Sequence, residues 1–300
     1  MENYFDIIGT GTAVIDDLLI LPDFPTQNTK VEVLQRKKQV GGSVPMALKT
    51  LTSLDLKTAF MGKIGNDEDS SFIKKQLRES GINVTNLVEE RGAKSPYSQV
   101  WININNGSRT IAVDSGKAPV LKERNLDFTC LAECKIFHID SNEHDVTKKL
   151  INLYKTKGAK ISIDTGRFKE KTLELLNMVD IIIMPLSFAM DWIGKYNFVG
   201  LISQVGAKYP NKLVIITDGE MGSICSCQGN IYRQKSFKVN CVDSTGVGGV
   251  YAGGILYGVT KNWEIPKTLE FAAAISALHC SKIGYDEMPG LAEVEAFLAN

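Results

Sequence analysis

The 300-residue chain has no net charge, because its 34 lysines and arginines are balanced by 34 aspartates and glutamates. A balanced chain has no overall field to attract a nucleic acid or an anionic membrane. Its first residues lack the basic start and apolar segment of a secretory signal, and its most apolar stretch, residues 179–190, is too short to span a bilayer. We therefore expect a cytoplasmic protein without nucleic-acid or membrane partners, in which any anionic ligand is bound by local groups.

Cysteine and histidine are also scarce, with six and three residues respectively, and they match no metal motif. Cys225 and Cys227 are closer together than a usual zinc-binding pair, whereas Cys130 and Cys134 have no second pair to complete a site. The histidines are too scattered for a catalytic triad. We expect reduced structural thiols, and the sequence assigns no metal ligands.

Short β-branched segments alternate with helical patterns through most of the chain. Such alternation predicts a parallel sheet with helices on both faces. A surface helix is expected between Asp67 and Gly81, where apolar residues recur among charges and the glycine supplies a left-handed stop. The expected buried strands are residues 5–8, 135–139, 160–163, 181–184 and 213–217.

Residues 14–40 and 95–113 break this alternation and contain no helical pattern. Apolar residues occupy every second position over 100–104, and a turn at 105–108 leads to a second strand from Arg109, which is typical of a hairpin. The two segments predict a small β-sheet that stands off the main body. Such a lid would exclude water, a competing acceptor in phosphoryl transfer.

Two motifs near the N-terminus are ambiguous when read alone. Gly9-Thr-Gly11 follows the first strand and suggests dinucleotide binding, but Val14 replaces the third small residue of that fingerprint. The first strand then runs on to Asp16. This residue is either a turn or cap residue or a carboxylate that accepts hydrogen bonds from two neighbouring sugar hydroxyls.

Two glycine motifs carry similar alternatives. Gly41-Gly42 precedes a helical run, and such a pair is either a turn or a place where a ligand approaches the backbone at the positive end of a helix. Thr217, Gly219 and Gly222 follow a strand, and they form either a hairpin turn or a backbone over which a nucleotide lies.

The segment from Asp243 to Gly254 is more specific. Its glycine-rich loop leads into a small-residue helix, and such a loop presents successive N–H groups to a developing phosphate charge. The alternative is a helix start that packs closely against a neighbouring element. Each glycine within a helix lowers its stability by up to about 1 kcal/mol, and close packing would offset that loss. The spacing favours anion binding by Gly246, Val247 and Gly248, next to Gly249.

This loop resembles the Asp-Thr-Thr-Gly-Ala-Gly-Asp signature of the ribokinase (PfkB) family of carbohydrate kinases, and further motifs follow that family's order across essentially the whole chain. Asp16 is similar to the family's sugar-binding aspartate. The other matching positions are Gly41 and Gly42, the glycine-aspartate turn at 62–67, Thr217, Gly219 and Gly222 at the nucleotide-binding strand end, and the adenine-pocket helix and turn at 272–280 and Gly284, which includes Ala277.

The resemblance implies one ribokinase-like domain over residues 1–300, a doubly wound α/β fold with a β-sheet lid at about 14–40 and 95–113. It implies ATP as phosphoryl donor, Mg²⁺, in some members a monovalent cation, a sugar as acceptor and often a homodimer formed through the lids. Arg109, within Gly107-Ser-Arg109-Thr, is similar to lid residues of kinases that act on ketoses, which weakly favours a fructose-like substrate.

The sequence departs from the family pattern at three places. Gly249 occupies the position of the aspartate that removes the hydroxyl proton, and glycine has no side chain that can take one. Residues 184–191 contain neither the Asn nor the Glu of the Asn-x-x-Glu motif linked to magnesium, and Met46 stands near the position of the Asn that commonly follows the glycine pair.

Two functions remain open at this stage. The first is a sugar kinase impaired by Gly249, for which Gly249→Asp is expected to raise phosphorylation at least about tenfold. The alternative is a non-catalytic regulatory protein that binds a sugar or nucleotide on a kinase fold. A further possibility is that another carboxylate, Asp243 or Asp16, acts as the base.

Overall fold

The computed structural model describes residues 4–115, 119–142, 144–194 and 197–299. Its main feature is a nine-stranded sheet. Seven neighbouring strands, β11, β10, β9, β8, β1, β4 and β5, run parallel, whereas β12 and β13 form an antiparallel edge. All five expected strands are confirmed. The strand order is β13 (Asn230–Gln234), β12 (Ser223–Cys227), β11 (Leu213–Thr217), β10 (Ile181–Pro185), β9 (Lys160–Asp164), β8 (Glu133–Ile139), β1 (Tyr4–Thr10), β4 (Thr58–Ile64) and β5 (Leu87–Glu89).

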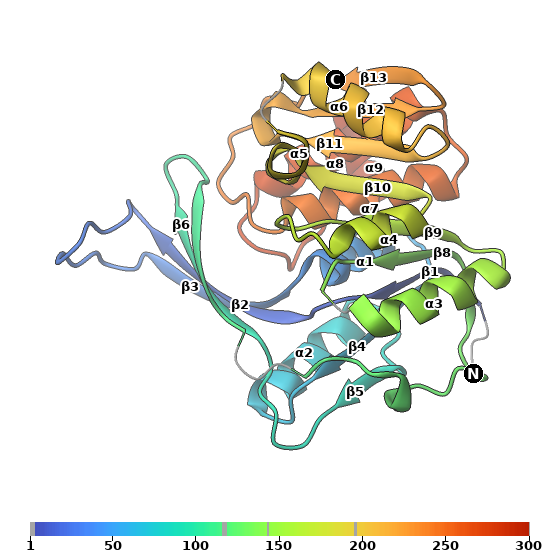
Figure 1. Ribbon diagram of the computed structural model, residues 1–300. Helices are drawn as coiled ribbons and strands as arrows, with labels where there is room; N and C mark the ends of the chain where they lie inside the picture. The colour runs from blue at the N-terminus through green and yellow to red at the C-terminus, as the bar shows by residue number, and fades with distance from the viewer. Residues whose placement is uncertain (1–3, 116–118, 143, 195–196, 300) are drawn as a thin grey trace.

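Helices cover both faces of this sheet (Figure 1). Side chains alternate along each strand, so Ile181 and Ile183 of β10 pack into one hydrophobic cluster and Ile182 into another. The first cluster includes residues of α1 (Ser43–Ser53), α2 (Glu68–Glu79), α7 (Val247–Thr260), α8 (Ile265–Cys280) and α9 (Leu291–Leu298). The second includes residues of α3 (His144–Thr156), α4 (Thr172–Met178), α5 (Leu186–Ile193) and α6 (Phe198–Lys208). The expected doubly wound α/β fold is confirmed.

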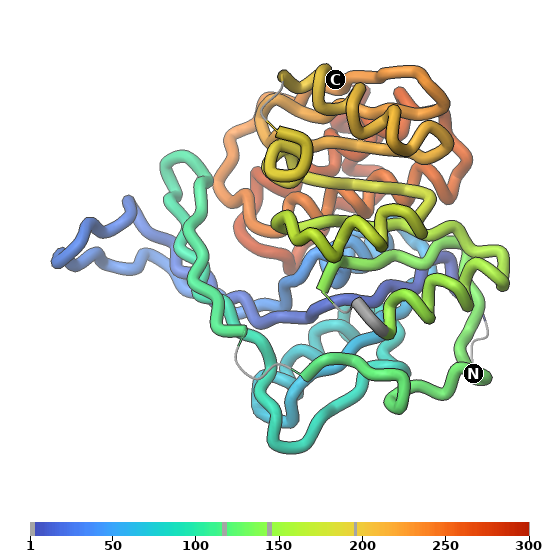
Figure 2. The backbone as a smooth tube through the Cα atoms, in the orientation of Figure 1, coloured from blue at the N-terminus to red at the C-terminus, as the bar shows by residue number. Residues whose placement is uncertain are grey.

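A second sheet of four strands projects from this body, as the backbone trace shows (Figure 2). We call it the small sheet. It has the order β3 (Gln35–Gly41), β2 (Val14–Leu21), β6 (Tyr97–Asn103) and β7 (Arg109–Asp114), and β6 and β7 form the expected hairpin.

One expectation about these strands was wrong. The first strand does not run on to Asp16, because β1 ends at Thr10 and β2 begins at Val14 in the other sheet. Between them the chain passes against β8, where the N–H of Thr12 donates to the Asp140 carboxylate at 2.9 Å. A Cβ atom at Gly11 would lie 2.5 Å from the same carboxylate, so the glycine permits this close passage.

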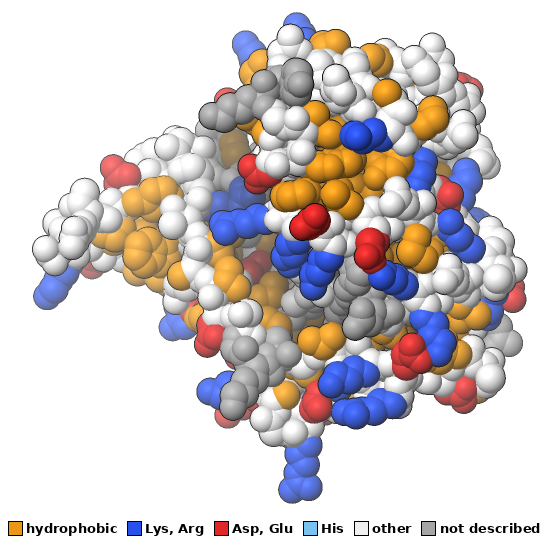
Figure 3. Space-filling model, viewed as in Figure 1, with side chains coloured by type: hydrophobic (Ala, Val, Ile, Leu, Met, Phe, Trp, Pro, Cys, Tyr) orange, Lys and Arg blue, Asp and Glu red, His pale blue; other side chains and the backbone are white. Residues whose placement is uncertain are grey.

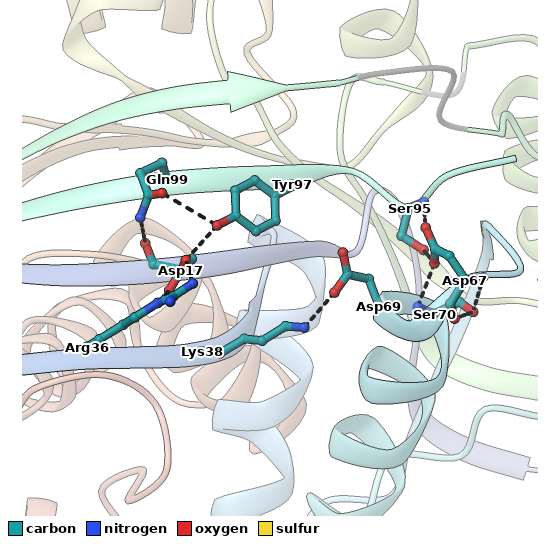
Figure 4. Close-up of polar contacts among 9 residues, drawn as sticks. All are labelled: Asp17, Arg36, Lys38, Asp67, Asp69, Ser70, Ser95, Tyr97 and Gln99. Carbon is teal, nitrogen blue, oxygen red and sulfur yellow. Dashed lines mark hydrogen bonds and ion pairs between the residues drawn. The ribbon is translucent and has the colours of Figure 1, made fainter.

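Asp67 fixes the start of α2 to the segment that leads into β6 (Figure 4). Its carboxylate accepts hydrogen bonds from the N–H of Ser70 and from the N–H and hydroxyl of Ser95, each at 2.9 Å. The helix that follows ends as expected, with Gly81 in the left-handed region at a φ of 78°. In the described ranges, no helix has both the length and the apolar character that crossing a bilayer requires.

Candidate active site

A cleft of about 330 Å³ lies between the small sheet and the C-terminal ends of the parallel strands. Ligands of open α/β folds bind at the C-terminal ends of the strands, because the loops after neighbouring strands can lead to opposite faces of the sheet and leave a crevice between them. Figure 3 shows the hollow between the small sheet and the body, with lysine and arginine side chains gathered beside it. The cleft is lined by Asp16, Gly42, Ser43, Arg109, Ile111, Asp164, Thr165, Pro185, Thr217, Thr245, Gly246, Gly248, Gly249 and Tyr285.

The start of helix α7 presents free backbone N–H groups to the cleft. Gly246 is left-handed, with a φ of 73°. The N–H of Val247 donates to the Ser244 carbonyl at 3.4 Å, and the N–H of Val250 donates to the Gly246 carbonyl at 3.1 Å. In the described part of the chain, the N–H groups of Gly248 and Gly249 have no acceptor. Free N–H groups at the positive end of a helix dipole are suited to binding an anion.

Gly249 packs against helix α1 and has no room for a side chain. A Cβ atom there would lie 2.7 Å from the Cβ atom of Met46 and 2.7 Å from the Ser43 carbonyl oxygen. One turn later, a Cβ atom at Gly253 would lie 2.7 Å from the Cβ atom of Thr50. The glycines therefore let α1 and α7 approach closely, which confirms the packing interpretation of this segment, while anion binding stays a prediction.

Asp16 enters the cleft from strand β2 and is 7% exposed. Its Oδ2 atom accepts a hydrogen bond from the Tyr285 hydroxyl at 3.3 Å. Burial raises the pKa of Asp16 to about 7, and the negative charge of Asp243 acts in the same direction. The carboxyl group is therefore close to the midpoint of its titration at neutral pH. Gly41 lies directly against it, since a Cβ atom there would be 1.9 Å from Oδ2.

Asp164 supplies a second carboxyl group, at the end of β9, and is 8% exposed. Burial raises its pKa to about 7, with a contribution from the charge of Asp140. It has no hydrogen-bond partner among the residues that the structure describes. The buried hydroxyl groups of Thr165 and Thr245, which also line the cleft, are likewise unpartnered there. This part of the cleft therefore holds several polar groups that are free to contact a ligand.

The turn of the small sheet touches the loop that precedes α7. The Gly107 carbonyl oxygen accepts hydrogen bonds from the N–H and the hydroxyl of Ser244, at 3.2 and 2.8 Å. Arg109 donates from Nη1 to the same hydroxyl at 2.8 Å. These contacts close one side of the cleft and place Arg109 at its edge.

The structure brings together many, but not all, of the residues expected at the site. Gly219 and Gly222 lie at the turn between β11 and β12, so the hairpin interpretation of that motif is confirmed, while Thr217 alone reaches the cleft. Ala277 is buried in α8 and Val247 is the first residue of α7; neither lines the cleft. Gly41 stands behind Asp16.

The lining residues that the sequence did not predict include Asp164, Thr165 and Tyr285. A signal existed for the first two, since they end the predicted strand at 160–163, and polar residues at the ends of parallel strands meet at one edge of a sheet. Tyr285 gave no local signal. Its N–H donates to Oε1 of Gln39 at 3.0 Å, a contact between residues distant in the sequence. In the described ranges, no three His, Cys, Asp or Glu side chains form a metal cluster.

Similar proteins identify the family. The chain is 22% identical to the ketohexokinase of Mus musculus, over 93% of this chain and 97% of that protein. It is 25% identical to the 5-dehydro-2-deoxygluconokinase of Geobacillus kaustophilus, over 89% of this chain and 87% of that protein. The solved structure of Arabidopsis thaliana ribokinase with ribose and ATP superposes with a TM-score of 0.82 at 19% identity, covering both chains fully (100% each). The sequence model of the pfkB family carbohydrate kinases matches residues 10–289, and the chain belongs to this family.

Proposed function

We propose that this protein transfers the γ-phosphoryl group of ATP to a sugar hydroxyl, at a rate lowered by the absence of a side chain at Gly249. The observation that carries the proposal is the free N–H pair of Gly248 and Gly249, which faces a cleft that also contains a buried carboxyl group from the small sheet. Phosphoryl transfer depends mainly on positioning and on neutralising charge, and the backbone supplies both without the missing aspartate.

Each part of the cleft has a role in this reaction. The N–H groups at the start of α7 would stabilise charge on the transferred phosphoryl group. Asp16 and Arg109 would hold the sugar from the small sheet, with Gly41 and Gly42 allowing its close approach. Thr217 would hold the nucleotide, together with Gly219, Gly222 and Ala277 outside the described lining of the cleft. On this proposal the chain is one domain, and the small sheet is the lid.

Mg²⁺ is part of the proposal, and one residue of the cleft fits it. Mg²⁺ typically takes one or two carboxylates together with phosphate and water oxygens, and it neutralises charge on the phosphates. Asp164 offers an unpartnered carboxylate inside the cleft. Asp140 does not, because it accepts hydrogen bonds from Thr12 and Asn142. In the described chain no group of residues identifies a site for a monovalent cation, which stays a prediction.

The acceptor is proposed to be a sugar with a keto group. Two observations support this: the position of Arg109 at the cleft edge, within the motif similar to that of ketose kinases, and the names of the ketohexokinase and 5-dehydro-2-deoxygluconokinase relatives, both of which describe keto sugars or sugar acids.

A second function is favoured by one specific contact. Because Gly249 is closely packed against Met46, the space around it suits a glycine in a helix contact and leaves no room for an aspartate side chain. A protein that only binds a sugar or nucleotide and closes its lid would need no base at this position. The two functions differ in whether ligand binding is followed by turnover.

A homodimer formed through the lids completes the proposal. The small sheet and the β2–β3 connection expose large apolar side chains, with Leu34 at 59% and Val113 at 65% exposure. A monomer in solution, measured by light scattering over a concentration series, would contradict it. The cytoplasmic location expected from the sequence remains a prediction.

The test of the function is ADP formation with a panel of ketoses, aldoses and nucleosides, run beside calorimetric binding of each compound. Sugar-dependent ADP formation with at least one ketose is expected. Binding without ADP formation for every compound would favour the non-catalytic function.

A further inference from the structure

Resting on the proposed function, we infer that Asp16 accepts the proton of the sugar hydroxyl that is phosphorylated, in place of a residue at position 249. The cleft contains few groups that could do so. Gly249 has no side chain, and the close approach of Ser43 and Met46 leaves no space for a water molecule at its Cβ position. A proton acceptor must therefore come from another element.

Asp243, two residues before Thr245, is excluded by its hydrogen bonds. One carboxylate oxygen accepts from the N–H of Thr245 at 2.8 Å and the other from the N–H of Gly284 at 2.9 Å. The residue is 1% exposed and does not line the cleft. Its carboxylate shapes the loop before α7 and has no access to a substrate.

Asp16 is linked to the anion-binding loop through a single side chain. The Tyr285 hydroxyl donates to Asp16 at 3.3 Å, and the same oxygen would be 2.8 Å from a Cβ atom at Gly246. Tyr285 is held on both sides, because its N–H donates to Gln39 and its ring stacks on His279 with centroids 5.7 Å apart. The Tyr285 hydroxyl therefore lies between Asp16 and Gly246, two residues before the N–H groups of Gly248 and Gly249 that would contact the phosphoryl group.

Asp164 lacks this link. It stands at the end of β9 on the main sheet, and the charged group that faces it is Asp140. Asp16 lies on the opposite wall, on β2 of the small sheet, where the sugar is proposed to bind. A carboxylate that accepts a hydrogen bond from a sugar hydroxyl is already in the geometry that proton transfer needs.

The environment of Asp16 suits a general base. It faces Tyr285 and Asp243 from the C-terminal half of the chain, Arg109 from β7 and Ser98 from β6. Burial affects the pKa of Asp16 more than any of these neighbours does, and it raises that pKa to about 7. A base whose pKa lies near the working pH combines a sufficient unprotonated fraction with the strongest tendency to accept a proton.

The O–H bond of the sugar breaks and its proton passes to the Asp16 carboxylate. The hydroxyl oxygen bonds to the γ-phosphorus of ATP, and the bond from that phosphorus to the β–γ bridging oxygen breaks, with its electron pair leaving on ADP. Asp16 then releases the proton to solvent when the product leaves.

The test compares four full-length proteins with a sugar that the unmodified chain turns over: the unmodified chain, Asp16→Asn, Asp16→Glu and Asp17→Asn. Asp17 is the next residue of β2, is paired with Arg36 at 2.6 Å and does not line the cleft, which makes it a matched loss of one carboxylate. For each protein we would measure kcat and KM between pH 5 and 9, and the affinity for ATP by calorimetry as a check of folding.

We expect Asp16→Asn to lower kcat by about 10²- to 10⁴-fold, the usual contribution of a general base, while ATP affinity is kept. The unmodified chain should lose kcat as pH falls below about 7, the pKa of Asp16. Asp164 lines the same cleft and its pKa is also raised to about 7, so it contributes to the acid loss in every variant. The part of the loss that depends on Asp16 should disappear in Asp16→Asn, shift in Asp16→Glu and stay unchanged in Asp17→Asn.

Three results would overturn the assignment. A rise in KM with unchanged kcat in Asp16→Asn would reduce Asp16 to a sugar-binding residue and leave the kinase function standing. A kcat of the unmodified chain that does not fall in acid would exclude the base even where Asp16→Asn fails to fold. No turnover by the unmodified chain with any sugar would overturn both the base and the proposed function.

Discussion

A Cβ atom at Gly249 would lie 2.7 Å from the Cβ atom of Met46. The sequence resemblance expects an aspartate at the first position and an asparagine near the second, and the two positions meet in space where α1 packs on α7. A distance below 3 Å between fixed carbon atoms requires one helix to move. Gly249 is therefore a packing residue in this protein, at the position where the sequence resemblance expects a base.

This contact predicts that Gly249→Ala destabilises the protein although alanine favours helices. The added methyl group overpacks the contact between α1 and α7, which typically costs about 1–3 kcal/mol. Gly248→Ala is the matched control, because a Cβ atom there meets nothing within 4 Å. We expect the free energy of unfolding, measured with urea, to fall for Gly249→Ala and to stay or rise slightly for Gly248→Ala. Equal values for the two variants would show that α1 moves freely.

The same contact bears on Gly249→Asp, for which the sequence alone predicts an increase in phosphorylation. The new side chain needs α1 to shift from Ser43 and Met46 before it can act as a base. We expect a loss of stability similar to that of Gly249→Ala, measured by thermal unfolding beside the activity assay. A variant that is both fully stable and more than about tenfold faster would show that the close packing is not a constraint.

The buried Asp164 predicts a pH dependence of stability. Its pKa is raised from 3.8 to about 7, so the folded state holds its proton more tightly than the unfolded state does. The stability that this group contributes is complete below about pH 4 and is lost as pH rises through about 7, by on the order of 4 kcal/mol in total. Asp164→Asn removes this loss. The difference in unfolding free energy between Asp164→Asn and the unmodified chain should therefore grow in favour of the variant from pH 5 to 8; a constant difference would contradict the raised pKa.

The contact between Ser244 and the turn of the small sheet predicts an effect on local motion. Ser244→Ala removes the hydroxyl group that donates to Gly107 and accepts from Arg109. A hydrogen bond contributes about 0.5–1.5 kcal/mol, so the turn should open more often by up to about tenfold. We expect faster amide exchange over residues 104–109. Ser203→Ala, in which a serine on the exposed side of α6 is changed, should leave that exchange unaltered.

Asp67 predicts a stability effect that its neighbour does not share. Its carboxylate caps α2 and also binds both polar groups of Ser95, so Asp67→Ala leaves several donors without a partner (Figure 4). We expect a loss of about 2–3 kcal/mol in unfolding free energy. Asp69→Ala breaks only a partly exposed ion pair with Lys38 and should cost less than about 1 kcal/mol. Similar losses for both variants would contradict the anchoring role of Asp67.

Local patterns predicted the parts of the fold that depend on local chemistry. The five buried strands, the helix ended by Gly81 and the hairpin around residues 105–108 were confirmed, because β-branched alternation, capping and turn residues act over a few positions. The break between β1 and β2 was missed, since it depends on the close passage of Gly11 against Asp140, which no short pattern reveals.

The site was predicted only as far as its motifs reach. Asp16, Arg109, Gly246, Gly248 and Gly249 line one cleft, as motif order suggested. Tyr285 was missed because its position depends on a hydrogen bond to Gln39, which is distant in the sequence, and on the stacking of its ring on His279. The raised pKa values of Asp16 and Asp164 follow from burial, a property of the packed molecule rather than of either motif.

Phosphoryl transfer to a sugar is most directly tested by ³¹P spectroscopy of the unmodified chain incubated with ATP and a ketose at neutral pH. We expect a slowly growing signal of a sugar phosphate ester, equal in amount to the ADP formed. ATP that stays intact, or ADP matched only by free phosphate, would contradict it and favour a protein that binds its ligands without transferring the phosphoryl group.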